Sequence, residues 1–242
     1  MSGHSKWSTI KRKKGAIDAK KAANFTKLAR EIEVAAREKG ADLSMNFRLR
    51  LAIDRARSAN MPKNKIEKAI ERGAGLGGTD NIEELIYEGY APGGIALLIK
   101  ALTDNRNRTA KDIKHILSKN GGSLANPGAV SFMFNKKAVF EVIITNLVDQ
   151  EDLQLSLIDY EVEEFLNDGD NLIIIVPVEQ ASAVESFLNK QNLKIISFSL
   201  DMIATSTIDV LETNIESLNK IITDLELLDD VETVYTNGNY VS

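Results

Sequence analysis

Apolar residues in the first third of the chain recur at intervals of three and four positions, the spacing of a helix with one buried face. The pattern predicts three helices, over residues 18–39, 45–59 and 62–72, and we expect them to form a small domain. The apolar stripe of the first helix consists of Phe25, Leu28, Ala29, Ile32 and Ala36. The stripe of the second helix consists of Met45, Leu49, Ala52, Ile53 and Ala56.

After a glycine-rich linker over 73–81, the apolar pattern changes to that of strands. Two strands are expected within 83–103, on either side of a Pro-Gly-Gly turn, followed by a helix over 108–119 and a strand over 129–134. The order strand, helix, strand, strand, helix, strand comes next, and it is the ferredoxin-like arrangement. These six elements are expected at 137–145, 150–158, 160–166, 171–177, 179–190 and 193–200.

A last helix over 211–228 and a last strand over 231–236 have no partner in that six-element unit, so we expect them to complete the sheet that begins near residue 82. The predicted fold class is α+β, with an N-terminal three-helix basic domain and two ferredoxin-like α/β domains, one inserted into the other. The predicted domains are 1–75 (the helical domain with an N-terminal arm), 76–135 plus 204–242 (the middle domain) and 136–203 (the inserted domain).

Charge is distributed unevenly along the chain. The formal net charge of the whole chain is −5, but residues 1–72 hold 19 of the 30 Lys and Arg and only 8 of the 35 Asp and Glu. The first part therefore carries a net charge of +11, and the remainder carries −16. Because binding to phosphates depends on local positive charge, this asymmetry indicates a polyanion-binding segment joined to an acidic body.

The first 16 residues lack helical or strand periodicity and are expected to form a flexible or partly ordered basic arm. Positive charge continues on the outward sides of the first two predicted helices, and the single tryptophan can stack on a base or a ribose. The alternative is a solvated face and a tail that the tryptophan anchors to the helices. The candidate nucleic-acid-binding residues are Lys6, Trp7, Lys11, Arg12, Lys13, Lys14, Lys20, Lys21, Lys27, Arg30, Arg50 and Arg57.

A second candidate is the segment DNRNRT, residues 104–109, where a strand passes into a helix. Free backbone N–H groups at a helix N-terminus attract anions, so Arg106 and Arg108 are candidates for a second nucleic-acid contact. Alternatively, the segment is a polar turn in which Thr109 and Asp112 form the helix cap. Spacing alone favours neither interpretation.

Several classes of site have no support in the sequence. There is no cysteine, and the two histidines lie more than a hundred positions apart, so no metal site is expected. Glycines 73, 75 and 78 match a dinucleotide-binding spacing but follow a helix instead of a strand, and no nucleophile motif occurs. We therefore expect a non-enzymatic, monomeric, cytoplasmic protein without cofactor, metal or membrane segment, whose acidic domains contact protein partners.

Five segments in order resemble the YebC family: GHSKWSTIKRKKGAIDAKKAANFTKLAREI, NFRLRLAIDRARSANMPKNKIEKAIERGAG, YEGYAPGG, LTDNRNRTAKDIKHILSKNGG and DVETVYTN. The resemblance runs from residue 2 to about residue 236. It implies three domains, one inserted in another, and a transcriptional regulator that binds DNA. It also points to translation, because mitochondrial members are regarded as translational activators and bacterial members have been linked to the ribosome and to elongation.

Three functions therefore remain open. The first is a DNA-binding transcriptional regulator of YebC type, although the segment ANMPKN between the second and third helices only weakly resembles a helix-turn-helix. The alternative is a translation factor that associates with the ribosome and its RNA, because a basic arm with an aromatic side chain suits irregular RNA. A protein-only scaffold would require the basic arm to be incidental.

Overall fold

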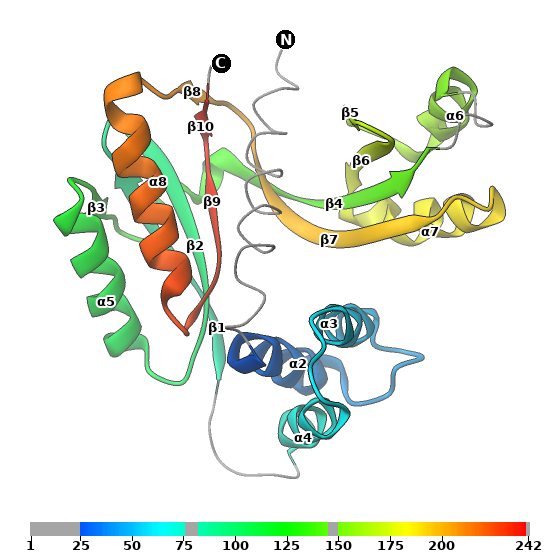
Figure 1. The fold of residues 1–242 in the computed structure, drawn as a ribbon, viewed down its shortest axis with the longest axis horizontal. Helices are drawn as coiled ribbons and strands as arrows, with labels where there is room; N and C mark the ends of the chain where they lie inside the picture. Colours follow the sequence, from blue (N-terminus) through cyan, green and yellow to red (C-terminus); the bar gives the residue numbers. More distant parts are fainter. Residues whose placement is uncertain (1–24, 76–81, 145–149, 241–242) are drawn as a thin grey trace. The chain divides into compact units, whose positions relative to one another are not determined.

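The structure is a computed structural model that describes residues 25–75, 82–144 and 150–240 (Figure 1). Within these ranges the chain forms two compact units. One unit consists of residues 134–205, and the other consists of the described residues before and after that segment.

Three helices open the described chain: α2 (Phe25–Lys39), α3 (Phe47–Ser58) and α4 (Lys63–Gly73). Their shared core contains most of the two predicted apolar stripes and adds Met61, Ile66 and Ala69. The prediction for Met45 is wrong, because this side chain is 77% exposed. Buried Asn46 caps α3 by accepting a hydrogen bond from the Leu49 amide (3.0 Å), so α3 begins after Met45.

The third helix includes Gly73, one residue beyond its predicted end. A Cβ atom at this position would lie 2.4 Å from the carbonyl oxygen of Glu33 and 2.7 Å from the Cβ of Ala36. The glycine therefore allows α4 to approach the backbone of α2 more closely than any other residue type would.

The same unit contains a four-stranded antiparallel sheet in the order β3-β1-β2-β9, and a short parallel pair, β8–β10. The helices α5 and α8 pack on one face of this sheet, where their apolar residues meet Leu97 and Ile99 of β2 (Figure 1). The elements are β1 (Glu83–Ala91), β2 (Ile95–Thr103), α5 (Arg106–Lys119), β3 (Ser123–Leu124), β8 (Ile208–Asp209), α8 (Glu212–Leu227), β9 (Val231–Thr236) and β10 (Gly238–Asn239).

The last helix and strand join this first sheet, as the sequence indicated, because β9 pairs with β2. The sheet has the two-layer form of a ferredoxin-like domain, but its connectivity differs from the ferredoxin-like order. Its two central strands, β1 and β2, follow each other directly in the chain. A tight turn joins them, and Gly93 and Gly94 have the positive φ angles that such a turn requires.

The prediction of a strand over 129–134 is wrong. Residues Ser131–Met133 form a short 3-10 helix, η1, and the strand begins only at Phe134. The cause is Glu88 of β1, a buried side chain whose carboxylate accepts hydrogen bonds from the backbone amides of Gly128 (2.7 Å), Val130 (2.6 Å) and Ser131 (2.9 Å). These amides point at the side chain instead of joining a ladder.

The second unit has the predicted order of strands and helices. Its antiparallel sheet runs β5-β6-β4-β7, the ferredoxin-like strand order. The strand expected over 160–166 begins at Glu164, because a 3-10 helix and left-handed Glu161 (φ 55°) precede it. The elements are β4 (Phe134–Ile143), α6 (Gln150–Leu157), η2 (Ile158–Tyr160), β5 (Glu164–Asp168), β6 (Asn171–Pro177), η3 (Val178–Gln180), α7 (Ala181–Lys190) and β7 (Ile195–Ala204). The predicted α+β fold class, with helices before two sheet-containing parts, is confirmed.

Candidate nucleic-acid interface

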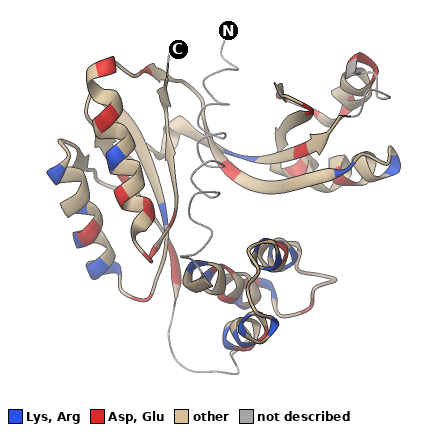
Figure 2. Cartoon of the chain, in the orientation of Figure 1, with Lys and Arg blue, Asp and Glu red and all other residues tan. Residues whose placement is uncertain are grey.

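The described ranges contain six of the fourteen residues that the sequence singled out for nucleic-acid binding. The other eight lie outside the described residues: Lys6, Trp7, Lys11, Arg12, Lys13, Lys14, Lys20 and Lys21. Cations are nevertheless frequent on the described helices α2 to α4 and on α5, as the blue positions of Figure 2 show. The contacts of each cation decide whether it can meet a phosphate.

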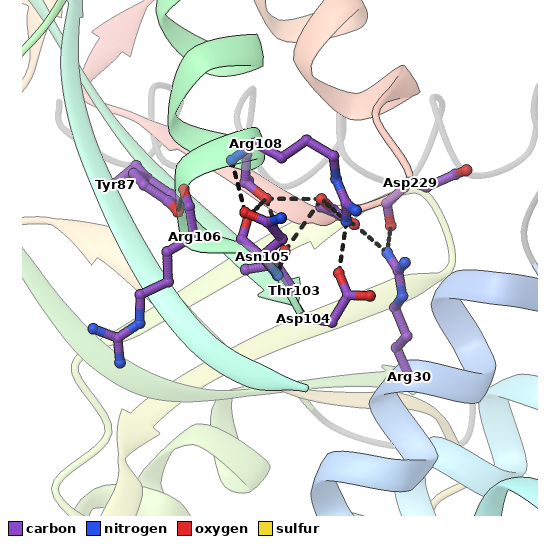
Figure 3. Close-up of polar contacts among 10 residues, drawn as sticks. Arg30, Tyr87, Thr103, Asp104, Asn105, Arg106, Arg108 and Asp229 are labelled. Carbon is purple, nitrogen blue, oxygen red and sulfur yellow. Dashed lines mark hydrogen bonds and ion pairs between the residues drawn. The ribbon is translucent and has the colours of Figure 1, made fainter. Parts of the chain in front are cut away.

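Asp230, between α8 and β9, is the centre of a polar cluster at the start of α5 (Figure 3). Its carboxylate accepts hydrogen bonds from the hydroxyl of Thr109 (2.7 Å) and from the guanidinium groups of Arg108 (2.9 Å) and Arg30 (2.6 Å). The hydroxyl of Thr103 lies 2.8 Å from that of Thr109. We call these five residues the Asp230 cluster.

The local sequence explains how the cluster forms. Asn105 caps α5 by accepting a hydrogen bond from the Arg108 amide (3.0 Å) through its side-chain oxygen. The alternative in which Thr109 and Asp112 form the helix cap is therefore wrong. Because Asn105 starts the helix, Arg108 and Thr109 fall in its first turn, where both side chains reach the carboxylate of Asp230.

Within the cluster, Asp230 and Arg108 each stabilise the ionised form of the other. Burial alone would raise the pKa of Asp230, but the hydrogen bonds from Thr109 and Arg108 and the positive charge of Arg30 outweigh it and lower that pKa. Hydrogen bonds to Asp230 and to Asp104 (2.7 Å) in turn raise the pKa of Arg108. The cluster is thus a set of mutually compensating charges.

The helix α2 contributes its cations to the same place. Arg30, with 17% of its side chain exposed, donates to the backbone carbonyl of Asp229 (2.8 Å) as well as to Asp230. Lys27 donates to the carbonyl of Glu226 in the last turn of α8 (2.6 Å). The last carbonyl groups of a helix have no partner within the helix and carry partial negative charge, so these two cations complete the end of α8.

Arg106 points away from the Asp230 cluster (Figure 3). Its guanidinium pairs with Glu83 of β1, and its carbonyl accepts a hydrogen bond from the hydroxyl of Tyr87 (3.0 Å). Arg106 remains 67% exposed, so its charge is accessible, unlike that of Arg30.

A second charged network joins the helices to the sheet, and sequence analysis missed it. Arg48 of α3 pairs with Glu38 (2.7 Å) and with Glu84 of β1. Lys100 of β2 lies 3.4 Å from the same Glu84 and 2.8 Å from Glu232 of β9. Burial would raise the pKa of Glu84, but Lys100 and Arg48 outweigh burial and lower it.

Arg50 and Arg57 of α3 lie outside these networks. The guanidinium of Arg50 donates to the carbonyl groups of Leu43 and Ser44 and lies over the ring of Phe47, 5.3 Å from its centroid. Arg57 is 68% exposed, and its contact among the residues that the structure describes is a long one with Asp54 (3.4 Å). Of the predicted cations on α2 and α3, Arg57 is the most available to a ligand.

A cleft of about 480 Å³ lies beside the Asp230 cluster. Four carboxylates line it, from Asp104, Asp112, Asp229 and Asp230, against the two arginines Arg30 and Arg108. An excess of negative charge does not suit a phosphate. In the described part of the chain, no group of acidic or histidine side chains is arranged to hold a metal ion.

His115, one of the two histidines of the chain, is exposed on α5. Across residues 25–75, 82–144 and 150–240, no helix combines the length and the apolar character needed to cross a membrane.

Comparison with known proteins gives consistent matches over nearly the whole chain. Residues 5–76 match the model of the TACO1/YebC protein N-terminal domain, and residues 82–238 match that of the TACO1/YebC second and third domain. The chain is 47% identical to a "probable transcriptional regulatory protein" of Kosmotoga olearia, covering 98% of this chain and 94% of that protein. A protein of Thermotoga maritima with the same description is 46% identical, with 98% and 93% covered.

The fold also matches a solved structure. The crystal structure of a conserved hypothetical protein from Aquifex aeolicus superposes with a TM-score of 0.80 at 38% identity, covering 90% of each chain. The family models account for the helices and for both α/β parts, and the resemblance found in the sequence is confirmed. This chain belongs to the TACO1/YebC family of regulatory proteins.

Proposed function

We propose that this protein is a non-enzymatic, nucleic-acid-binding regulator of gene expression that contacts phosphates through its basic N-terminal segment. The observation that carries the proposal is the charge asymmetry, +11 over residues 1–72 against −16 over the remainder. Displacing counterions from phosphates favours binding wherever positive charge is locally concentrated. The acidic remainder limits non-specific attachment to polyanions and leaves a surface for protein partners.

The primary form of the proposal is a cytoplasmic DNA-binding transcriptional regulator. It is supported by the description shared by the relatives from Kosmotoga olearia and Thermotoga maritima. In this form the arm residues neutralise backbone charge, Trp7 stacks or wedges between bases, and exposed Arg57 and Arg106 add contacts.

The second candidate is a translation factor that binds ribosomal RNA. The observation that favours it is the combination of six basic residues and one tryptophan within the first 20 positions, all before the described helices. Basic segments with an aromatic side chain bind irregular RNA through phosphates and base stacking, without a recognition helix in a major groove.

Sedimentation of the native protein from a cell lysate on a ribosome gradient separates the two candidates. Migration with ribosomal particles that survives DNase and is lost with RNase supports the translation factor. A protein that stays at the top of the gradient and shifts a particular promoter fragment at physiological salt supports the transcriptional regulator. A protein that binds neither nucleic acid contradicts the proposal as a whole.

A further inference from the structure

One side of α4 is basic and the other is acidic. Lys65, Lys68 and Arg72 follow each other at intervals of three and four residues and therefore share one side of the helix. Glu67 and Glu71 are also four residues apart and share another side, while the apolar side packs into the helical core. These five residues are exposed, as is the sixth charged residue of the helix, Lys63, which lies 3.6 Å from Glu67. The helix thus presents an edge with a single sign of charge.

The two lysines of this edge differ from Arg72 and from the paired arginines of α2 and α3 in what they contact. Lys65 lies over the ring of Phe25, with its Nζ atom 5.1 Å from the ring centroid. Within the described ranges, neither Lys65 nor Lys68 is paired with a carboxylate, whereas Arg30, Arg48 and Arg72 all are. Lysines without a carboxylate partner keep their full charge available for a phosphate.

The position of the edge connects it with the basic arm in the sequence. Phe25, under Lys65, begins α2, and Lys21 precedes it by four residues. Lys20 and Lys21 stand five and four positions before Phe25 in the sequence. The α4 edge therefore lies beside the residue at which the chain enters α2.

The outer side of α5 offers a comparison, because Lys111 and Lys114 are exposed and have the same spacing as Lys65 and Lys68. Their surroundings differ in charge. The adjacent helix α8 packs against α5 and carries four acidic residues, Glu212, Glu216, Asp224 and Glu226, against one lysine, Lys220. Figure 2 shows the red positions along α8. Neighbouring negative charge weakens the attraction of a polyanion to α5.

We infer that Lys65 and Lys68 on the edge of α4 form a phosphate-binding surface that extends the basic N-terminal segment, and that Lys111 and Lys114 on the outer side of α5 form none. The partner is the sugar–phosphate backbone of a nucleic acid. This inference rests on the proposed function and adds to it a site outside the residues predicted from the sequence. Each lysine that neutralises one phosphate adds about 0.9 to the magnitude of the salt slope on B-DNA and about 0.7 on a single strand.

The test compares two double variants of the full chain, Lys65→Gln/Lys68→Gln and Lys111→Gln/Lys114→Gln. Both remove two charges at the same spacing, so net charge is matched. The probes are a short mixed-sequence DNA duplex and an RNA hairpin, and affinity is measured by fluorescence anisotropy over a series of salt concentrations. For the α4 variant we expect a roughly tenfold loss of affinity and a salt slope on the duplex smaller by about 1.8. For the α5 variant we expect a change of at most about twofold.

Three results overturn the inference. Equal losses in both variants would show that only net charge matters, and an α4 variant that binds like the unaltered protein would show that the edge makes no contact. A Lys65→Arg/Lys68→Arg variant that loses affinity as the glutamine variant does would also contradict it, because arginine keeps both charges. In each of these cases the unaltered protein still binds. Failure of the unaltered protein to bind either probe is a distinct result and contradicts the proposed function itself. Thermal melting of each variant confirms that it is folded.

Discussion

The side of α2 that faces the end of α8 and the edge of α4 carry the same residue types but use them differently. Lys27 and Arg30 of α2 bind carbonyl and carboxylate oxygens at the end of α8, within the same chain. Lys65 and Lys68 of α4 have no carboxylate partner in the described part of the chain. The number of cations in a basic domain therefore overstates the number that can meet a phosphate.

The difference has a simple physical origin. The end of a helix exposes carbonyl groups without partners, and Asp230 adds a full negative charge just beyond α8. A cation that reaches this position replaces water in a partly buried site, and its interaction with the carboxylate is stronger there than at the surface. Lys65 and Lys68 have no comparable site beside them, because Glu67 and Glu71 of α4 are exposed and, within the described residues, neither forms an ion pair with these lysines.

The largest effect is expected from Asp230→Ala, which removes the carboxylate that the cations of α2 and α5 share. Removing the carboxylate leaves Arg30, Arg108 and the hydroxyl of Thr109 without their shared acceptor. We expect a loss of about 3 kcal/mol in the free energy of unfolding, measured by urea titration. Ala substitution at exposed Glu216 of α8 is a control that should change this free energy by no more than about 0.5 kcal/mol. Equal effects of the two substitutions would contradict the role of the cluster.

The next largest effect concerns the seating of α4. In Gly73→Ala, the added methyl group would overlap the carbonyl of Glu33 and the side chain of Ala36, so the helix must shift. We expect a loss of about 2 kcal/mol in unfolding free energy and a lower melting temperature. Gly75→Ala is the comparison variant. A Cβ atom at Gly75 would meet no neighbouring atom within 4 Å, although the φ angle there is positive, so any loss of stability at Gly75 comes from backbone strain and not from crowding. A Gly73→Ala protein as stable as the original would show that the close approach of α2 and α4 is not required.

Arg30→Gln sharpens the comparison most clearly, since the sequence predicted a phosphate contact for this residue. In the structure, the guanidinium of Arg30 donates hydrogen bonds to the carboxylate of Asp230 and to the carbonyl of Asp229. We expect a loss of about 1–2 kcal/mol in unfolding free energy, because one of several partners of a partly buried carboxylate is removed. The salt slope of DNA binding should stay unchanged in the folded protein. A slope reduced by about 0.9 would instead show that Arg30 contacts a phosphate.

The smallest effect is a dependence of stability on acid pH. The pKa of Asp230 and that of Glu84 are lowered in the folded protein, so their ionised forms stabilise it above the unfolded pKa values, about 3.9 for Asp and 4.3 for Glu. This contribution disappears as the pH falls through the lowered folded values. We expect the unfolding free energy to fall below pH 4 and the fall to be shallower in Asp230→Asn. Identical pH profiles for the two proteins would contradict the assignment.

Periodicity in the sequence was sufficient for the helices, the ferredoxin-like order of the second unit and the return of the last strand to the first sheet. It failed where a distant side chain decides the local structure. Glu88 turns residues 128–131 away from the expected strand, from about 40 positions earlier in the chain. The cap by Asn105 had a local signal, an Asx residue directly before the helix, that points to this residue instead of Thr109.

The partners of the predicted cations could not be read from the sequence for the same reason. Arg30 and Arg108 meet Asp230 across 200 and 122 positions, and no local pattern indicates such a pairing. A helical wheel places Arg30 on the outer side of an isolated helix, which is correct. That side of α2 faces another part of the chain instead of solvent. Apart from the predicted basic arm, the cations that we expect to contact phosphates are Lys65 and Lys68 of α4 and the exposed Arg57 and Arg106.

The most direct test of the account is the salt slope of DNA binding for the full chain and for a variant that lacks residues 2–21. We predict that the variant keeps its fold, loses most of its affinity and retains only the small slope that the α4 edge and the exposed Arg57 and Arg106 supply. A variant that keeps the full slope would place the phosphate contacts elsewhere, on the cations of the Asp230 cluster or of α5, and would contradict the central claim.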